Sequence, residues 1–387
     1  MPNVLLVANT AWYLYNFRLP LIRYLQQQGF HVELVAPNDH YRSLLEAEGL
    51  TVHPWAVNRR SIDPRVESEA LLDLIRIYRQ VQPDLVHHFT IKACLYGTLA
   101  AKAAGIHHVL NAITGLGHVF LGERRRSRAL RWVLKPIYRT IFTARRSVVV
   151  FQNAADQELL VSMGLIDLRK TLVIRGSGVD TRHFHPDHFP ALTRTIPQML
   201  FPSRLIREKG VRELLQAVQL LQKWGHQFEL KIAGELDTGN RSALTAKELQ
   251  QLQNSPGIAC LGHVEDIRPI LAAADIVVLP SYREGLSKAL IEAAAMEKAI
   301  VTTDVPGCRD VVDHGRTGLL VPVKDTDSLA RSLELLLLNP DLTERFGRAA
   351  RAKVLQEFDA DLVNARTVAQ YRHMLSWKTS PSLPISA

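Results

Sequence analysis

Short apolar runs alternate with longer amphipathic segments along most of this chain. In the first half, strand-like runs such as Asn3–Ala8 and His31–Ala36 alternate with segments of helical spacing, among them Leu19–Gln28, which ends before Gly29. The second half repeats this alternation. Because strands that alternate with helices form parallel sheets covered by helices on both faces, the pattern predicts an α/β protein made of two such halves.

The elements can be placed from the apolar pattern and its Gly and Pro punctuation. The predicted strands are 3–8, 31–36, 84–87, 109–113, 147–151, 199–202, 229–233, 258–261, 276–279, 299–302 and 318–321. The predicted helices are 19–28, 71–81, 93–104, 210–224, 267–274, 287–296, 328–338 and 342–358. The junction is expected near 176–197, which gives domains at 1–185 and 186–360, and a disordered tail is expected at 378–387.

Composition narrows the class of protein. The 387 residues are 47% hydrophobic and 22% charged, which is ordinary for a globular chain and excludes a disordered or polytopic membrane protein. No apolar run approaches the roughly 18–20 residues of a membrane span. Cys94, Cys260 and Cys308 lie far apart, without the spacing of metal ligands, so we expect a reducing, cytoplasmic setting and no bound metal.

The charge is concentrated in one segment. The net charge is +9, and the stretch from His118 to Arg146 holds nine Lys or Arg against one acid, Glu123. A nucleic-acid binder would spread its charge more widely, so nucleic acid is not the expected partner. On a helical wheel the cations that share one side are Arg124, Arg128, Arg131, Lys135 and Arg139, opposite an apolar side.

This basic amphipathic segment, 124–142, has three interpretations. It can lie on an anionic membrane surface, form a wall for a polyanionic substrate, or be a solvated helix packed by its apolar side. Of these we favour the anionic membrane or a lipid-phosphate substrate, which predicts a protein peripheral on the cytoplasmic face of the membrane.

Two glutamates stand at spacing E-x7-E in the second half. Glu284 follows a predicted strand, and Glu292 lies in the next predicted helix. The amino end of that helix, near 286–288, presents backbone N–H groups that suit a phosphate. Glu292 can then accept hydrogen bonds from vicinal ribose hydroxyls, and Glu284 from sugar hydroxyls. Two ordinary surface glutamates are the alternative interpretation.

Other candidate residues also follow predicted strands. Arg204 and Lys209 can neutralise a diphosphate, although a basic pair in a loop is often only surface charge. Gly234 allows a nucleotide to approach the backbone, and Val264 offers backbone groups to a base. A G-x-G-x-x-G after the first strand and a Walker A motif are both missing from the sequence, which argues against a dinucleotide dehydrogenase and a P-loop ATPase.

These residues, in this order, resemble the retaining nucleotide-sugar glycosyltransferases of family 4, which have the GT-B fold. The resemblance rests on Arg204 with Lys209, the E-x7-E pair, GSGVD at 176–180 and PGCRDVVDHGRTGLLVP at 306–322, and extends from about Asn3 to Tyr371. It implies two Rossmann-like domains that face each other across a cleft. The acceptor would bind the first domain and the nucleotide sugar the second, and a last helix at about 361–376 would pack back on the first.

The resemblance also implies roles for single residues. Arg204 and Lys209 would hold the donor diphosphate, and Glu284 would bind the donor sugar, which makes these three the candidate catalytic residues. Glu292 would bind ribose. The remaining candidates for the donor site are Gly234, Val264, Gly285, Leu286 and Ser287. The UDP-sugar is a substrate, no cofactor or divalent metal is implied, and the anomeric configuration is retained.

Departures from the family pattern point to a subgroup. Trp12–Arg18 stands where many members carry a Gly-Gly pair in the first loop, and AITGLG at 112–117 replaces a histidine-containing stretch, leaving His88 or His118 as alternatives. NFR, HHFTIK, TGLG and FQN resemble enzymes that add a sugar, often an N-acetylhexosamine from a UDP donor, to a polyprenyl-diphosphate-linked saccharide. The acceptor-side candidates are Asn16, Arg18, His88, Thr114, Arg124, Arg125 and Arg126.

The sequence thus predicts a retaining hexosyltransferase that moves an N-acetylhexosamine or hexose in surface-glycan synthesis. Its partners would be a nucleotide sugar, a lipid-linked saccharide and an anionic membrane surface. Two alternatives remain open. A UDP-sugar 2-epimerase has the same two-domain shape but no use for the basic segment. An inactive, membrane-docked scaffold would not need Arg204, Lys209, Glu284 and Glu292.

Overall fold

The chain divides into two compact units. A computed structural model describes residues 1–59, 61, 63–115, 139, 146–190, 195–237, 240 and 242–376. Unit 1 comprises Met1–Ser177 and Ala360–Ala387, and unit 2 comprises Gly178–Asp359. The predicted tail at 378–387, His118, Arg124–Arg126 and nearly all of the basic segment lie outside the described residues.

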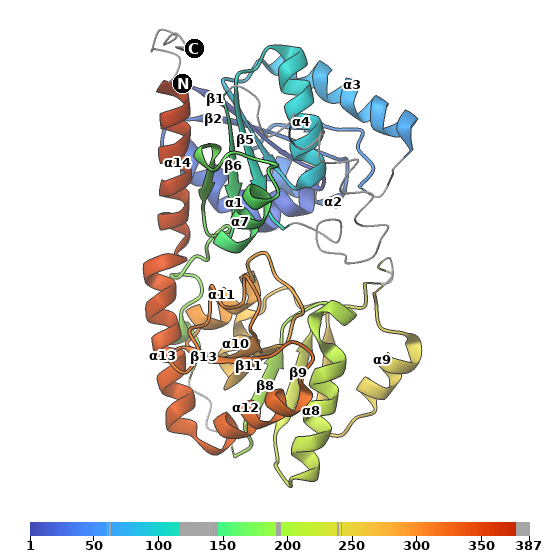
Figure 1. The fold of residues 1–387 in the computed structure, drawn as a ribbon, viewed down its shortest axis with the longest axis vertical. Coiled ribbons are helices and arrows are strands. Elements are labelled where there is room, and N and C mark those ends of the chain that lie inside the picture. The colour runs from blue at the N-terminus through green and yellow to red at the C-terminus, as the bar shows by residue number, and fades with distance from the viewer. Residues whose placement is uncertain are drawn as a thin grey trace. The chain divides into compact units, whose positions relative to one another are not determined.

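Unit 1 contains a seven-stranded parallel sheet in the order β3-β2-β1-β4-β5-β6-β7 (Figure 1). Its strands are β1 (Asn3–Ala8), β2 (His31–Ala36), β3 (Val52–Pro54), β4 (Leu85–Phe89), β5 (His108–Ile113), β6 (Ser147–Phe151) and β7 (Thr171–Val173). The two edge strands, β3 and β7, were not predicted, because three residues carry too little pattern to be recognised. The α/β class with parallel sheets is confirmed.

Helices cover both faces of this sheet. They are α1 (Ala11–Gln27), α2 (His40–Ala47), α3 (Pro64–Val81), α4 (Ile91–Ala104), α7 (Ala154–Ser162) and α14 (Ala360–Ser376). Alternate residues of β1 serve the two faces. Val4 and Leu6 pack with α1 and α14, whereas Leu5 and Val7 pack with α3 and α4.

The first helix begins earlier than predicted. Trp12–Arg18 is helical, not a loop, and α1 starts at Ala11 because Thr10 accepts a hydrogen bond from the Tyr13 N–H (3.2 Å). Pro20 lies inside the helix, where a proline is unfavourable, so the sequence favours a later start than the structure has. Asn16 and Arg18 are therefore carried on the first half of a helix.

The chain enters unit 2 before the predicted boundary at 186. The Val179 N–H donates to the Phe358 carbonyl (2.9 Å), and Val179 pairs with Asp359 in parallel fashion. The segment by which the chain enters unit 2 and the segment by which it leaves therefore lie side by side. Beyond Asp359 the chain returns to unit 1, where α14 contributes Val363, Tyr371 and other apolar side chains to the core.

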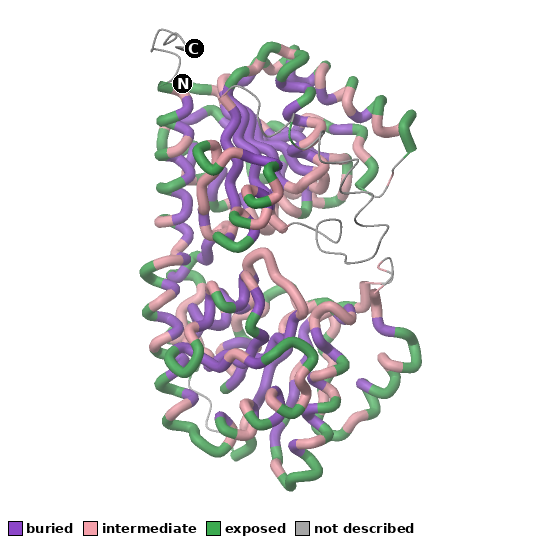
Figure 2. The backbone as a smooth tube through the Cα atoms, viewed as in Figure 1, coloured by how far each residue is buried: buried purple, intermediate pink, exposed green. Residues whose placement is uncertain are grey.

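Unit 2 contains a six-stranded parallel sheet in the order β10-β9-β8-β11-β12-β13. Its strands are β8 (Gln198–Phe201), β9 (Glu229–Ala233), β10 (Ile258–Gly262), β11 (Ile276–Leu279), β12 (Ala299–Thr303) and β13 (Gly318–Val321). Its helices are α8 (Val211–Lys223), α9 (Ala246–Gln253), α10 (Arg268–Ala273), α11 (Lys288–Ala295), α12 (Thr326–Leu338) and α13 (Pro340–Glu357). Figure 2 shows the central strands of each sheet buried and the outer helix faces exposed.

The order of strands locates the ligand-binding edge of unit 2. From β8, the next strands in the sequence, β9 and β10, are added on one side of the sheet. The later strands β11 to β13 are added on the other side, so the strand order reverses between β8 and β11. In open parallel sheets, ligands bind at the carboxyl ends of the strands at such a reversal. The loops after β8 and β11 carry Lys209 and Glu284. Within the described residues, no helix is both long and apolar enough to cross a bilayer.

Candidate active site

An ion pair between Lys209 and Glu284 lies at the reversal of strand order. Lys209 ends a short 3-10 turn after β8, and Glu284 lies in the loop between β11 and α11. The Lys209 Nζ is 2.5 Å from the Glu284 Oε1, and the two side chains are only 18% and 11% exposed. The structure therefore brings together two of the three predicted catalytic residues, as a largely buried pair of opposite charges.

Main-chain packing between the two loops fixes this pair. A Cβ on Gly210 would lie 2.0 Å from the Pro280 carbonyl oxygen, and the Gly210 φ of +73° favours glycine. The Tyr282 N–H donates to the Glu208 carbonyl (2.8 Å), which also accepts from the Ser281 hydroxyl (3.1 Å). Because the loops touch backbone to backbone, Lys209 is held next to Glu284 without help from a ligand.

Arg204 lies in the same loop but is differently engaged. Its side chain is 55% exposed and forms an ion pair with Asp237, in which Nη1 and Oδ2 are 2.8 Å apart. It is therefore not bonded to Glu284. As an exposed guanidinium on a loop after β8, it can change its partner at little cost.

Gly234 and Val264 lie in the loops after β9 and β10. A Cβ on Gly234 would stand 1.9 Å from the Ser203 carbonyl oxygen. The glycine is thus required where two loops of the protein meet, a reason that the sequence analysis did not anticipate. Val264 is half-buried and packs against the core of the unit.

Glu292 lies one turn into α11, partly covered by the protein. Its side chain is 16% exposed, and its Oε1 forms an ion pair with the Lys288 Nζ, 3.5 Å away. Burial raises the pKa of Glu292 above its ordinary value, and the charge of Lys288 opposes this shift. The carboxylate is therefore incompletely compensated within the protein, as expected of a group that awaits hydroxyl donors.

The amino end of α11 is closed by the loop after β12. Ser287 is buried, and its N–H donates to the Gly307 carbonyl at 3.4 Å. This amide therefore already has an acceptor, whereas the sequence predicted that it would be open to a phosphate. The Leu286 N–H has no protein acceptor among the described residues. A Cβ on Gly307 would lie 2.7 Å from the carbonyl oxygens of both Glu284 and Gly285.

Gly307 packs against the loop that carries Glu284, a contact that the sequence does not predict. Its N–H is held by Asp310 Oδ2 (3.0 Å), and its φ is +80°. The PGCRD stretch around it belongs to the motif at 306–322 that resembles the family pattern. Next to it, Cys308 is fully buried, and burial together with the charge of Glu284 raises the pKa of its thiol to about 12. The thiol is therefore neutral and unreactive at physiological pH.

The acceptor-side candidates that the structure describes belong to unit 1. Arg18 is 5% exposed, donates to the Tyr13 hydroxyl (2.7 Å), and has its guanidinium carbon 4.4 Å from the centroid of the Phe89 ring. Asn16 is half-buried and donates to the Trp12 carbonyl (2.9 Å). Thr114 follows β5 and is half-buried.

His88 is a core residue. It is fully buried, with its Nε2 2.8 Å from the Tyr78 hydroxyl and its Nδ1 2.7 Å from Asn111 Oδ1. Its ring occupies the space where a Cβ of Gly97 would stand. Burial lowers its pKa to about 4, so it is neutral. The expectation that His88 contacts an acceptor is therefore not supported, because both ring nitrogens are engaged inside unit 1.

Comparison with known families agrees with this geometry. Residues 3–153 match the family model of "Glycosyl transferase 4-like" proteins, and residues 189–353 match that of "Glycosyl transferases group 1". The chain is 26% identical over 94% of its length, and 96% of the relative's, to the N,N'-diacetylbacillosaminyl-diphospho-undecaprenol alpha-1,3-N-acetylgalactosaminyltransferase of Campylobacter jejuni. It is 23% identical to the capsular polysaccharide biosynthesis glycosyltransferase CapM of Staphylococcus aureus, over 92% and 94% of the two chains.

Solved structures share the fold. A glycosyltransferase from Rickettsia africae superposes with a TM-score of 0.79 at 21% identity, covering 97% of this chain and 98% of that one. Anabaena Alr3699/HepE in complex with UDP and glucose gives 0.77 at 19% identity, covering 95% and 99%. The two parallel-sheet units, the two family models and these relatives together identify the chain as a glycosyltransferase with the GT-B fold, made of a family 4-like unit and a group 1 unit.

Proposed function

We propose that this glycosyltransferase moves an N-acetylhexosamine or hexose from a UDP-sugar to a polyprenyl-diphosphate-linked saccharide, with retention of configuration, in surface-glycan synthesis. The observation that carries the proposal is the buried Lys209–Glu284 pair at the reversal of strand order in unit 2. The similarity to a Campylobacter transferase named for a diphospho-undecaprenol substrate supports the acceptor class, and the UDP complex of a structural neighbour supports the donor.

Donor binding follows from the charges of this edge. The ammonium of Lys209 and the guanidinium of Arg204 neutralise the diphosphate, while the half-buried carboxylate of Glu292 accepts from the ribose hydroxyls. Once Lys209 turns to the phosphates, Glu284 is released to accept hydrogen bonds from the sugar. The Leu286 N–H offers a further donor to phosphate.

Transfer needs stabilisation of the departing UDP. The oxygen of the acceptor hydroxyl forms a bond to the anomeric carbon on the face from which the diphosphate leaves. The bond from that carbon to the β-phosphate oxygen breaks, and the hydroxyl proton passes to a leaving phosphate oxygen. Lys209 and Arg204 stabilise the charge that develops on the diphosphate, so we propose that no divalent metal is required.

The acceptor side is proposed to lie on unit 1. Arg18 is a buried cation for which no described carboxylate is a bonded partner, which suits an anionic acceptor group. The basic segment 124–142 would rest on the anionic surface of the cytoplasmic membrane leaflet, where such an acceptor is found. The protein would thus be peripheral on the cytoplasmic face.

Calorimetric titration with UDP, GDP and ADP in the presence of EDTA tests the donor site. We expect UDP to bind without metal and Lys209→Ala to weaken binding at least about tenfold. A chelator-sensitive interaction would contradict the metal-free mechanism, and failure of all three nucleotides to bind would favour an inactive scaffold.

The reaction itself is tested with a labelled UDP-N-acetylhexosamine and a polyprenyl-diphosphate-linked saccharide. The expected product is an elongated lipid-linked saccharide whose new linkage keeps the anomeric configuration of the donor, as read by NMR. Release of an epimerised sugar or UDP-sugar without an acceptor would instead show an epimerase.

A further inference from the structure

A small cavity of unit 1 lies on the face of the sheet that α1 and α14 cover. Its volume is about 10 Å3, about the space of one water molecule. Three polar side chains that line it are Arg18 from α1, His87 from β4 and Gln152, which follows β6. Val150 of β6 and Thr367 of α14 also line it, and every lining residue belongs to unit 1. The space therefore suits one water-sized group rather than a polyatomic ligand.

Arg18 brings a positive charge to this cavity. It is 5% exposed, and no carboxylate among the described residues is bonded to it. Its Nε and Nη2 donate to the Tyr13 hydroxyl (3.2 and 2.7 Å), and its Nη1 donates to the Gly176 carbonyl (3.4 Å). These bonds use three of the five N–H groups of a guanidinium, and each acceptor is neutral. A buried cation without a counter-charge is strongly unfavourable, so an anion here would stabilise the fold.

His87 provides a second, independent indication of a ligand. Its Nδ1 lies 2.6 Å from the hydroxyl of Tyr371, which is not one of the residues that line the cavity. Its Nε2 is buried and has no hydrogen-bond partner among the described residues. When the Tyr371 hydroxyl donates to Nδ1, the neutral ring carries its proton on Nε2. Because buried polar atoms are almost always paired, we expect this N–H to donate to a ligand in the adjoining cavity.

Charge and size together select the ligand. A water molecule fits the space but leaves the charge of Arg18 unbalanced. A phosphate, a sulfate or a carboxylate balances the charge, but its several heavy atoms exceed a volume of about 10 Å3. We propose that the cavity binds a monatomic anion, a halide such as chloride, which accepts hydrogen bonds from the Arg18 guanidinium and the His87 Nε2–H. The proposal concerns the enzyme without acceptor and does not depend on which sugar is transferred.

Thermal unfolding in different salts tests the site. Sodium chloride is compared with sodium gluconate at equal ionic strength, since gluconate is too large for the cavity. At roughly ten times its Kd, chloride should raise the melting temperature of unit 1 by about 2–4 °C, and bromide should act alike. Equal melting temperatures in chloride and gluconate would overturn the proposal in favour of a water site. Stabilisation by inorganic phosphate that Arg18→Gln removes would overturn it in favour of an oxyanion site.

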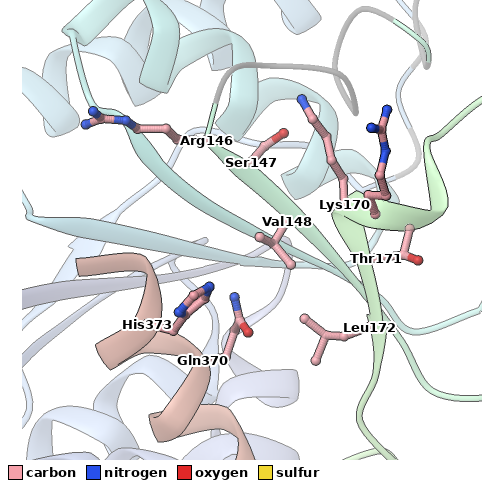
Figure 3. A pocket seen from close by; sticks show the side chains of 9 residues that line it. Arg146, Ser147, Val148, Lys170, Thr171, Leu172, Gln370 and His373 are labelled. Atoms are coloured by element: carbon pink, nitrogen blue, oxygen red, sulfur yellow. The ribbon is translucent and has the colours of Figure 1, made fainter. Parts of the chain in front are cut away.

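Two variants of β6 locate the effect. Val150→Ile adds one methylene group at the cavity and leaves every charge in place. Val148→Ile is the matched control, because Val148 lies on the same face of β6 and is as well buried, 7% against 6% exposed. Figure 3 shows Val148 at a different and roomier cavity of about 400 Å3. Val150→Ile and Arg18→Gln should lose the chloride shift, whereas Val148→Ile should keep it.

Near-UV circular dichroism verifies the fold of each variant. Val150→Ile is a conservative change, so it decides the test if Arg18→Gln does not fold. A full chloride shift in folded Val150→Ile would contradict the site.

Bromide and NMR observe the site directly. Crystals of the full chain grown in sodium bromide should show an anomalous peak in contact with Arg18 and the His87 Nε2. In solution, 15N NMR of labelled histidine should find His87 protonated on Nε2, with a resonance that moves when chloride replaces gluconate. A ring protonated on Nδ1 would repel an anion at Nε2 and would overturn the proposal. A bromide peak without the shift in solution would mean binding at crystal concentration only, which also contradicts it.

Discussion

The Nδ1 of His87 lies 2.6 Å from the hydroxyl oxygen of Tyr371, although the two residues are 284 positions apart in the sequence. This contact joins β4 in the centre of the unit 1 sheet to α14. His87 is 3% exposed, and its Nε2 has no protein partner among the described residues. Burial lowers the pKa of His87 well below its ordinary value, and the positive charge of Arg18 acts in the same direction.

Stability should therefore fall as the pH falls below about 6.5. An unfolded histidine takes up a proton near pH 6.5, whereas folded His87 and His88 do not, since His88 has a pKa of about 4. The unfolded state then binds more protons, and each histidine removes about 1.4 kcal/mol of unfolding free energy per pH unit. Urea unfolding between pH 7 and 5 measures this slope. His87→Gln should halve it, and an unchanged slope would contradict the assignment.

The Lys209–Glu284 pair should show coupling in a double-mutant cycle. Lys209→Met and Glu284→Gln each leave a poorly exposed charge without its partner, so each should cost about 1–3 kcal/mol of unfolding free energy. The double variant should cost less than the sum, with a coupling of about 1–2 kcal/mol. All three variants should lose most transfer activity. Additive stabilities would show that the pair is not formed in solution.

Glu292→Gln should lower nucleotide affinity without lowering stability. Because burial raises the pKa of Glu292, the ionised carboxylate is unfavourable in the folded protein at pH 7, and its neutral isostere relieves that cost. UDP affinity should fall about tenfold or more, since one hydrogen bond to a charged group is lost. The control with the opposite sign is Glu248→Gln. Glu248 caps α9, hydrogen bonds from Thr245 lower its pKa to about 2, and its loss should reduce the melting temperature but not UDP binding.

Gly307→Ala should impair transfer although Gly307 carries no side chain. Its new Cβ would lie 2.7 Å from the carbonyl oxygens of Glu284 and Gly285, so the backbone that carries Glu284 must shift. Gly315→Ala is the matched control, because Gly315 has a similar φ of +73° but open space around its Cβ position. In both variants the left-handed backbone should cost about 1–2 kcal/mol of unfolding free energy. Only Gly307→Ala should lower kcat by tenfold or more, and equal activity of the two would refute this role.

The regular apolar patterns of the sequence made the sheets predictable. Features that depend on contacts between distant residues could not be predicted in this way. The longer strands of the two sheets and most of the helices between them could be read from alternation. The three-residue edge strands β3 and β7 and the short helices α2, α7 and α9 were not predicted. The start of α1 was misplaced because a proline is unfavourable inside a helix, whereas the structure has Pro20 within the continuous helix Ala11–Gln27. The first turns of this helix, Ala11–Arg18, mix aromatic and polar residues without a clear helical pattern. The sequence therefore does not show that Thr10 is the N-cap.

The candidate site was predictable only as a set of residues. The letters around Lys209 and Glu284 indicated a donor site, but their 2.5 Å contact depends on Gly210 fitting against Pro280 in another loop. For the same reason the role of Gly307 could not be assigned. His88 is the opposite case. The motif around it suggested an acceptor-binding residue, but its ring is buried in the core, in the space that Gly97 leaves open.

The return of α14 to unit 1 also sets the order in which the protein can be completed during synthesis. Tyr371 and Met374, which fill the core beside β4, are translated after all of unit 2. A nascent chain that stops at Asp359 therefore carries an uncovered apolar face on its first unit, even though that unit's sheet has already emerged from the ribosome. The N-terminal unit is begun first and finished last, so the unfinished protein is most exposed to chaperones and proteases while its second unit is being made.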